Sequence, residues 1–205
     1  MRHWVILDET RGVVVDGERI GVEAQGMGMI DEIYRGYVGN YMKYFKMDSL
    51  CKVGFVASEL LLAKESGSRD VEQRKCYGTA ERAIVLFNES GSLYTDTRYQ
   101  ATISDEENYF PSPALFVYTL ANIVTGEIAI RNKYYGETNF LVLPEKNSQA
   151  MAVQVSALFA DKETQSAIVG WVECDAEEHF EVRMALVGRD DNIENDIKTL
   201  IEWKN

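Results

Sequence analysis

Cysteine, a side chain suited to both covalent catalysis and metal binding, is sparse and scattered in this chain. The three cysteines, Cys51, Cys76 and Cys174, are odd in number and far apart, so they predict neither a disulfide framework nor a zinc site. Cys51 falls inside an apolar segment, where a small core residue is expected. Cys76 lies between Lys75 and Tyr77, and cationic neighbours alone do not make a nucleophile. We therefore expect no metal and no cofactor.

Acid–base candidates are equally few. The chain has two histidines, His3 and His179, and His179 follows Glu177 and Glu178 in a polar turn, where a solvated histidine is more common than a general base. No serine lies in a Gly-x-Ser-x-Gly elbow, and the Gly-Met-Gly-Met run at 26–29 lacks the last glycine of a dinucleotide-binding fingerprint. Spacing alone therefore assembles no catalytic set.

Composition and charge limit the class of protein. The 205 residues, 46% hydrophobic and 26% charged, suit one globular domain with a sizeable core. No stretch approaches the ~20 apolar residues that span a bilayer, and the apolar run at 4–7 ends at Asp8, so no secretory signal is expected. The formal net charge of -12 argues against a binder of duplex nucleic acid and against a general attraction to anionic membranes. A cytoplasmic protein is expected.

Strands are predicted along most of the chain. A hairpin is expected at 4–20, with its turn at Asp16-Gly17. Residues 21–47, rich in Gly and Tyr, are expected to form loops with a short helix, and 192–202 a polar helix. The later strands are predicted at 83–87, 139–143, 167–172 and 180–187.

Three further segments predict helices that are apolar nearly all round. One runs from the N-cap Asp48 to a stop at Gly67, one from Ser112-Pro113 to Ile130, and one from about Pro144 to Asp161. A helix of this kind is buried on more than one side, so several of them imply layers of helices covered by a sheet. Their alternation with strands predicts an α/β sheet closed by a hairpin.

This order of elements is that of half a thiolase-like fold, and several residue runs resemble ketosynthases, the condensing enzymes. The segment from Ser112-Pro113 to Ile130 is similar to the ketosynthase helix with the pattern S-P-x-x-F-x-x-x-L-x-N-x-x-A-G-x-I-A-I. Tyr135-Gly136-Glu137 lies where these enzymes have a Gly-Pro pair, and the run at 167–173 resembles their strand ending in A-G-G-x-E. Phe45-Lys46-Met47-Asp48 adds a likeness to small ketosynthase-like proteins found beside aryl-polyene or flexirubin-type pigment genes.

The resemblance covers about residues 40–190. It implies a thiolase-like half-fold, α/β with a mixed sheet and buried central helices in αβα layers. It also implies a single domain over 1–205 that corresponds to the N-terminal half of a ketosynthase, with the C-terminal half absent.

The resemblance also places the family nucleophile. In ketosynthases the cysteine opens the buried helix nine positions after the glycine of the Gly-Pro pair, where the helix N-terminus favours the thiolate. Counted from Gly136, that position is Glu145. A carboxylate cannot form the acyl-thioester intermediate, so loss of condensing activity is implied. Glu145 also has a structural interpretation, because the helix macrodipole favours an acidic residue in the first turn.

Two departures from the family bear on function. Chain length factors, the relatives that act as partners of an active subunit, also lack the cysteine but carry glutamine there, so Glu145 puts a link to malonyl decarboxylation in doubt. The two decarboxylation histidines of condensing enzymes come from the C-terminal half, which the resemblance implies is absent, so no such histidine pair is expected.

Two surfaces are candidates for partners. Arg35, Lys43, Lys46 and Lys52 lie among tyrosines with Asp48 as the only acidic residue between 35 and 52, which favours either a docking patch for an acidic acyl carrier protein or a solvated, aromatic-stacked loop edge. In the family the strand equivalent to 139–143 pairs across the two-fold axis of the dimer, so a homodimer, or a heterodimer with a full ketosynthase, is implied. The residues of that strand are Asn139, Phe140, Leu141, Val142 and Leu143.

Three hypotheses follow. The first is a non-catalytic ketosynthase-like subunit or accessory protein in fatty-acid or polyketide synthesis, with aryl-polyene synthesis as one setting, paired with an active condensing enzyme or an acyl carrier protein. The second is an enzyme that uses Glu145 as an acid or base on an acyl thioester, for example in decarboxylation. The third is a stand-alone acyl-ligand-binding protein.

Overall fold

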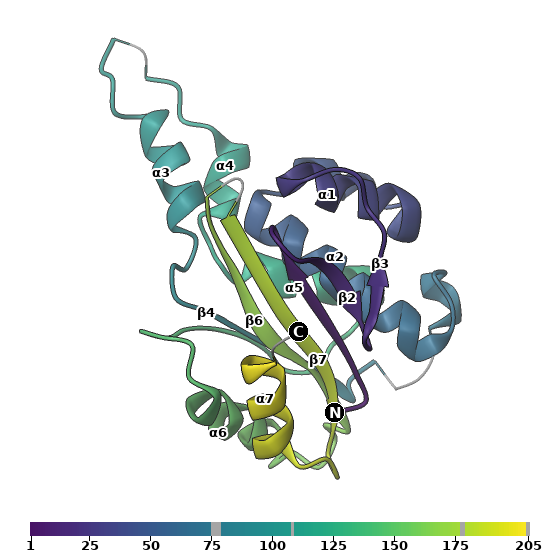
Figure 1. Cartoon of the computed structure of the whole chain (residues 1–205). Coiled ribbons are helices and arrows are strands. Elements are labelled where there is room, and N and C mark those ends of the chain that lie inside the picture. Colours follow the sequence, from purple (N-terminus) through teal and green to yellow (C-terminus); the bar gives the residue numbers. More distant parts are fainter. Residues whose placement is uncertain (75–78, 108, 177–178, 204–205) are drawn as a thin grey trace.

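The computed structural model of the chain describes residues 1–74, 79–107, 109–176 and 179–203. Cys76 and the Glu177–Glu178 pair of the sequence analysis lie outside these residues. One mixed sheet forms the centre of the protein, as predicted (Figure 1). Its strands, in spatial order, are β3 (Glu18–Ile20), β2 (Gly12–Val15), β1 (His3–Asp8), β7 (His179–Gly188), β6 (Ser166–Ala176), β4 (Arg82–Asn88) and β5 (Thr138–Val142).

Strand direction divides the sheet in two. Strands β4, β5 and β6 are parallel, whereas β7, β1, β2 and β3 follow as antiparallel pairs. The predicted turn between β2 and β3 is confirmed, because Asp16 (φ 49°) and Gly17 (φ 86°) both have the left-handed backbone that a type I′ hairpin turn requires. Asp16 also accepts a hydrogen bond from the backbone of Trp4 at 2.8 Å, which ties the turn to β1.

The central helix is α2 (Ser49–Ser66), and it has the predicted ends. The Asp48 side chain accepts the N–H of Cys51 at 2.9 Å, and Gly67 (φ 68°) ends the helix in the left-handed region. Thirteen of its 18 residues are buried, so the prediction of a helix covered on several sides is confirmed. A side chain at Gly54 would lie 2.6 Å from Val124, which shows how closely α2 packs on its neighbour α5 (Ile123–Asn132).

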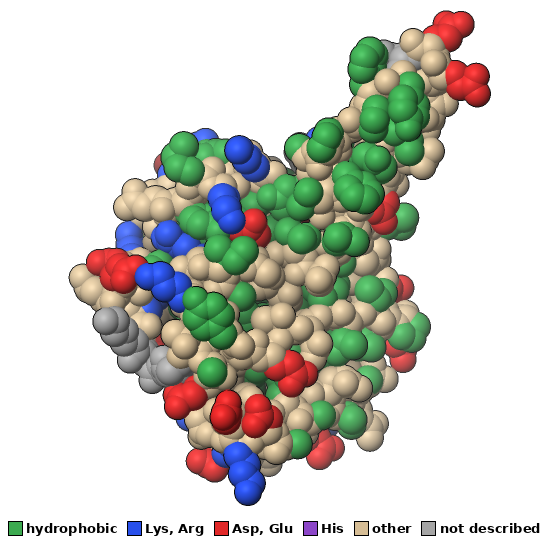
Figure 2. Space-filling model, turned by 180° about the vertical axis from the view of Figure 1, so that it is seen from behind, with side chains coloured by type: hydrophobic (Ala, Val, Ile, Leu, Met, Phe, Trp, Pro, Cys, Tyr) green, Lys and Arg blue, Asp and Glu red, His purple; other side chains and the backbone are tan. Residues whose placement is uncertain are grey.

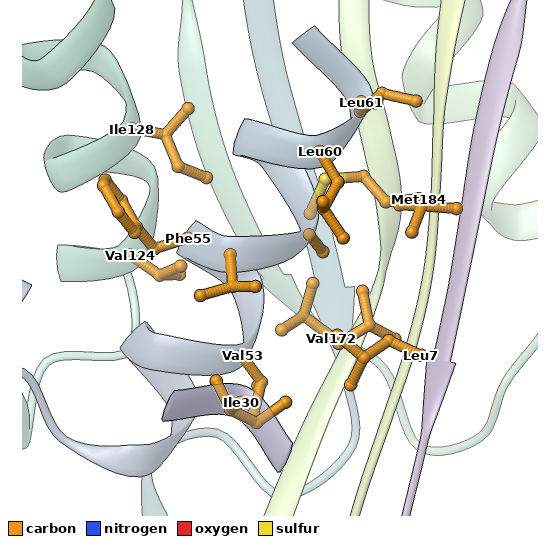
Figure 3. Close-up of a cluster of buried hydrophobic side chains, with 14 of the residues drawn as sticks. Leu7, Ile30, Val53, Phe55, Leu60, Leu61, Val124, Ile128, Val172 and Met184 are labelled. Atoms are coloured by element: carbon orange, nitrogen blue, oxygen red, sulfur yellow. The ribbon is translucent and has the colours of Figure 1, made fainter. Parts of the chain in front are cut away.

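Figure 3 shows α2 between the sheet and α5. Apolar side chains of α2 meet those of the strands on one side and those of α5 on the other, and α1 (Gly26–Ile33) extends the same cluster. The labelled members are Leu7, Ile30, Val53, Phe55, Leu60, Leu61, Val124, Ile128, Val172 and Met184. Short helices at Tyr34–Val38 (η1, π), Met42–Lys46 (η2, 3-10) and Val71–Gln73 (η3, 3-10) lie in the connections.

The opposite face of the sheet is covered by α6 (Ser148–Leu158) and α7 (Ile193–Glu202), which completes the expected αβα layers. Met151, Val155 and Leu158 of α6 pack with Val85 and Phe87 of β4 in a second core cluster. The expectation that this helix is buried on more than one side is wrong for the described residues, because Val153 on its outer face is exposed. Its start is also later than predicted, at Ser148 rather than near Pro144.

The segment 112–130 is two helices rather than one. Ser112 caps α4 (Pro113–Tyr118), and the chain turns at 119–122 before α5 begins. Only α5 reaches the sheet, and α4 has no buried residue. The prediction of one buried helix was therefore wrong in its first half, because apolar residues alone do not distinguish a core helix from one with an exposed apolar face.

A helix that the sequence did not predict, α3 (Leu93–Ala101), pairs with α4 to form a projection from the body of the protein (Figure 1). Residues 92–107 and 109–120, which we call the arm, include both helices. Within the described part of the chain, none of the helices combines the length and apolarity that crossing a bilayer needs.

Candidate functional site

The count that assigns the family nucleophile position to Glu145 starts at Gly136, which precedes β5. A Cβ at Gly136 would lie 2.3 Å from the carbonyl oxygen of Arg82 and 2.9 Å from that of Ala80. The neighbouring Tyr135 N–H donates to the Thr79 carbonyl at 2.7 Å. The backbone of β5 thus enters the sheet pressed against the start of β4, and this close approach requires glycine.

Glu145 lies before the first residue of α6 and not in the first turn of the helix. The residues after β5 form a bend at Pro144 and Glu145, and Asn147 is the N-cap of α6, with its side-chain oxygen accepting the Ala150 N–H at 3.0 Å. Glu145 is exposed and precedes the first helical residue, Ser148. The expectation of an acidic residue in the first turn is therefore wrong, since the macrodipole acts within that turn.

The next residue, Lys146, belongs to a charge network on the sheet. Its ammonium group pairs with the Glu181 carboxylate and lies 5.5 Å from the centre of the Trp171 ring. Glu181 also accepts from Arg183 Nε at 2.5 Å. Burial alone would raise the pKa of Glu181, but hydrogen bonds from Lys146 and Arg183 hold it below its ordinary value. The segment that carries the family nucleophile position is therefore held by a structural ion pair.

The two histidines contact carboxylates at the ends of strands. His3 Nδ1 lies 2.6 Å from Asp16, and the exposed His179 contacts Asp175, with Glu9 at 3.9 Å. Hydrogen bonding to Asp175 raises the pKa of His179 above its ordinary value. Among the described residues no group of three or more His, Cys, Asp or Glu is placed to hold a metal ion.

The run that resembles A-G-G-x-E has two structural roles. A Cβ at Gly170 would lie 2.4 Å from the Arg183 carbonyl, so the close pairing of β6 with β7 requires glycine there. Glu173 accepts the N–H of Glu89 at 2.8 Å and the Ser90 hydroxyl, and so holds the loop that follows β4. Both motif residues thus position the carboxyl ends of the parallel strands.

Strand β5 is an edge of the sheet. It pairs with β4, and no other described strand lies on its far side. The Glu137 carbonyl and the Leu143 N–H form hydrogen bonds with β4 at 2.9 and 2.8 Å. The backbone N–H and C=O groups of odd-numbered residues are therefore directed at β4, and those of even-numbered residues at the free edge. Val142 is 57% exposed, and the strand carries no lysine or proline that would discourage pairing. The backbone groups on the free side belong to Thr138, Phe140 and Val142.

A cleft of about 610 Å³ lies between β5 and the base of the arm. Apolar side chains from both sides face it, together with a few polar groups near the start of α3. The lining of the cleft includes Leu93, Asp96, Leu120, Asn122, Phe140 and Val142.

Hydrogen bonds fix the base of the arm beside this cleft. The Ser92 hydroxyl donates to the Thr119 carbonyl, which joins the start of α3 to the turn after α4. Thr95 Oγ1 donates to the buried Asp48 carboxylate at 2.5 Å, which joins α3 to the start of α2. Burial raises the pKa of Asp48. The arm therefore leaves the body in a defined direction.

The predicted basic patch is only partly assembled. The rings of Tyr34 and Tyr44 stack with centroids 3.7 Å apart, and this brings Arg35 beside η2, where Lys43 and Lys46 are exposed. Figure 2 shows Lys and Arg gathered on this face of the body. Two of the lysines have carboxylate partners: Lys52 lies 3.4 Å from Asp31 and 5.0 Å from the Tyr44 ring centre, and the exposed Lys43 lies 3.9 Å from Glu127. Exposed Met42 and Phe45 lie within the patch.

The arm is a candidate interaction surface that the sequence did not predict. Its side chains Phe110, Phe116 and Val117 are exposed, and Figure 2 shows hydrophobic side chains along the arm and on the body at its base. The signal was the apolar run from Leu115 to Tyr118, which predicts burial against something but does not say whether the cover comes from the same chain.

Comparisons with known proteins agree with the geometry. The structure titled the ishigamide ketosynthase/chain length factor matches with a TM-score of 0.64 and 16% identity over 94% of this chain and 62% of that chain. A chain of the ketosynthase (ApeO) in complex with its chain length factor (ApeC) from Xenorhabdus doucetiae matches with a TM-score of 0.59 and 11% identity over 98% of this chain and 88% of that chain.

The chain thus spans less than two thirds of the first of these proteins and most of the second. No protein-family model and no curated protein matches it. Both structural likenesses concern the fold, and they agree with the order of elements and motifs described above. The chain has the fold of these ketosynthase and chain length factor structures.

Proposed function

We propose that this protein is a non-catalytic ketosynthase-like subunit that pairs with an active condensing enzyme in fatty-acid or polyketide synthesis. The observation that carries the proposal is the free edge of β5 among the described strands. The assignment of Glu145 to the family nucleophile position, which the resemblance implies, supports a role without condensation. Both structural neighbours are named for a ketosynthase together with a chain length factor, which supports an accessory role of this kind.

A second strand paired along β5 would supply hydrogen-bond partners for the backbone groups on its free edge. The outward backbone groups at Phe140 and Val142 are complementary to another extended strand, and strand addition satisfies such groups with main-chain hydrogen bonds. A full ketosynthase carries the corresponding strand at its own dimer edge. We therefore favour a heterodimer with a full ketosynthase over a homodimer.

The surroundings of Glu145 support a role without a covalent step. The residue is exposed and lies before the helix, and its neighbour Lys146 is paired with Glu181. The hypothesis that Glu145 is an acid or base in decarboxylation gains nothing from these surroundings, because the side chain is exposed rather than enclosed in a site that could hold an acyl thioester against it.

The cleft beside β5 favours a second contribution to the same function. It has apolar walls at Phe140 and Leu120 and polar groups at Asp96 and Asn122, which suits a flexible acyl chain with a polar end. In a pair formed through β5 the cleft lies at the interface, so it provides part of the wall of an acyl pocket. Aryl-polyene synthesis is one setting for such a pair.

The exposed part of the basic patch is the proposed contact for an acyl carrier protein. Lys43 and Lys46 surround the exposed apolar side chain of Phe45. An acidic protein surface with an apolar centre complements this arrangement. A cytoplasmic location remains a prediction.

Co-expression with a full-length ketosynthase from the same organism tests the proposal. We expect a heterodimer by size-exclusion chromatography with light scattering, and Val142→Lys is expected to abolish it while leaving the fold intact, because Val142 is exposed. The matched control is Val153→Lys on the outer face of α6, which also replaces an exposed valine. A protein that stays monomeric in the presence of the ketosynthase contradicts the proposal.

A further inference from the structure

The arm has more exposed apolar surface than a projection that serves only its own chain requires. Phe110 is 73% exposed and Phe116 54%, and Leu93, Tyr109 and Leu120 are exposed as well. Clustered apolar side chains of this kind mark surfaces that another molecule covers. Neither α4 nor the segment before it contributes a buried residue to the sheet.

Internal contacts give the arm a defined structure. The rings of Tyr99 and Phe116 lie with centroids 5.5 Å apart, which packs α3 against α4. The Phe110 N–H donates to the Thr102 carbonyl at 3.0 Å and joins the two limbs near the tip. Because Ser92 closes the base of the arm on Thr119 and Thr95 joins it to Asp48 of the body, the arm presents its apolar side chains at a defined angle.

The tip of the arm is acidic. Asp105, Glu106 and Glu107 are consecutive and exposed, and the Glu107 N–H donates to the Asp105 carboxylate at 2.9 Å. Figure 2 shows carboxylates at the end of the arm, beyond its hydrophobic flank. A surface that receives the arm must therefore offer an apolar groove with basic residues where the tip lands.

The position of the arm identifies the occupant. Leu93 and Leu120, at its base, line the same cleft as Phe140 and Val142 of β5. A chain that adds a strand to the free edge of β5 therefore lies beside the arm. Five residues of β5 offer little area by themselves, whereas a stable interface buries on the order of 800 Å² on each partner.

We propose that the arm is a second contact with the ketosynthase that pairs through β5, and that it lays its apolar flank on that subunit with its acidic tip against basic residues. The inference rests on the proposed function. It adds a prediction about the partner, namely a basic patch on the ketosynthase about one arm length from the paired strand. The arm also makes the choice of partner specific, because a like-charged surface at the tip would be rejected.

Two variants of the full-length chain test the arm. Phe110→Ser/Val117→Ser removes apolar side chains at exposed positions and keeps the Tyr99–Phe116 contact, and Asp105→Lys/Glu106→Lys/Glu107→Lys reverses the charge of the tip. Binding to the purified ketosynthase is measured by surface plasmon resonance at several salt concentrations, with Val153→Lys as control and circular dichroism to confirm folding. We expect the apolar variant to raise the Kd by ~10-fold or more. The tip variant is expected to slow association and to lose the salt dependence of the association rate.

The outcomes separate the two proposals. If Val142→Lys abolishes binding while both arm variants bind as the parent does, the arm inference is wrong and the proposed function stands. If the parent chain does not bind the ketosynthase, both are wrong. If the arm variants weaken binding and Val142→Lys does not, the arm is the contact and pairing through β5 is wrong.

Discussion

The side-chain oxygen of Asn147 accepts a hydrogen bond from the N–H of Ala150 at 3.0 Å, so α6 begins beyond Glu145. The helix N-terminus is therefore directed at the Asn147 position. Lys146 holds the intervening segment through its ion pair with Glu181. The arrangement separates Glu145, to which the resemblance assigns the nucleophile position, from the first turn of α6, where the helix dipole acts.

Restoring the cysteine is consequently not expected to restore chemistry. In Glu145→Cys we expect a thiol with a pKa of about 8.5, the value of an unperturbed cysteine, because the side chain is exposed and precedes the helix. The pH dependence of alkylation at residue 145, followed by mass spectrometry with the parent chain as blank, measures it. A pKa below about 7, or acylation by an acyl thioester, would contradict this account.

Pairing through β5 makes a prediction at the level of the backbone. Val142→Pro removes an N–H that points away from β4, so the sheet is retained while an added strand loses a hydrogen bond and meets the ring. We expect the variant to fold but not to co-purify with the ketosynthase. Val142→Thr keeps the N–H and is expected to pair like the parent chain. Equal recovery of the proline and threonine variants would show that the edge is not used.

Gly136 and Gly126 form a matched pair for stability. A Cβ at Gly136 would lie 2.3 Å from a backbone carbonyl, so Gly136→Ala is expected to lower the free energy of unfolding by about 2 kcal/mol or more. A Cβ at Gly126, in α5, meets nothing within 4 Å, so Gly126→Ala is expected to raise the free energy by about 0.5–1 kcal/mol. Urea denaturation measures both. Equal effects of the two substitutions would mean that β5 enters the sheet differently.

His179 gives a prediction about pH. Hydrogen bonding to Asp175 raises the pKa of His179 in the folded state, so its contribution to stability is present below the pKa of the unfolded chain and is lost as pH rises through the folded pKa. Asp175→Asn is expected to lower the pKa of His179. Titration of the histidine resonances by NMR, with His179→Gln to assign the signal, measures the shift. An unchanged pKa in Asp175→Asn would exclude Asp175 as the cause.

Local features predicted a large part of the fold. The N-cap Asp48 and the stop at Gly67 define α2 because a cap and a left-handed glycine act on the residues next to them. The Asp16-Gly17 turn and the strands at 83–87 and 167–172 follow from turn chemistry and apolar runs in the same way. The position of Glu145 followed from counting along the chain.

Long-range contacts decided the rest. The sequence cannot show that, among the described strands, β5 has a neighbour on one side only, because this depends on the order of the strands in the folded sheet. It could not separate α4 from α5, because the same apolar pattern suits a core and an interface. The sequence also could not show that Lys52 is paired with a carboxylate, because only the fold places Asp31 beside it. Periodicity and helix caps depend on residues that are neighbours in the chain, so the sequence predicts them. The surface proposed to bind a partner consists of residues far apart in the sequence, which only the folded sheet and the arm bring together.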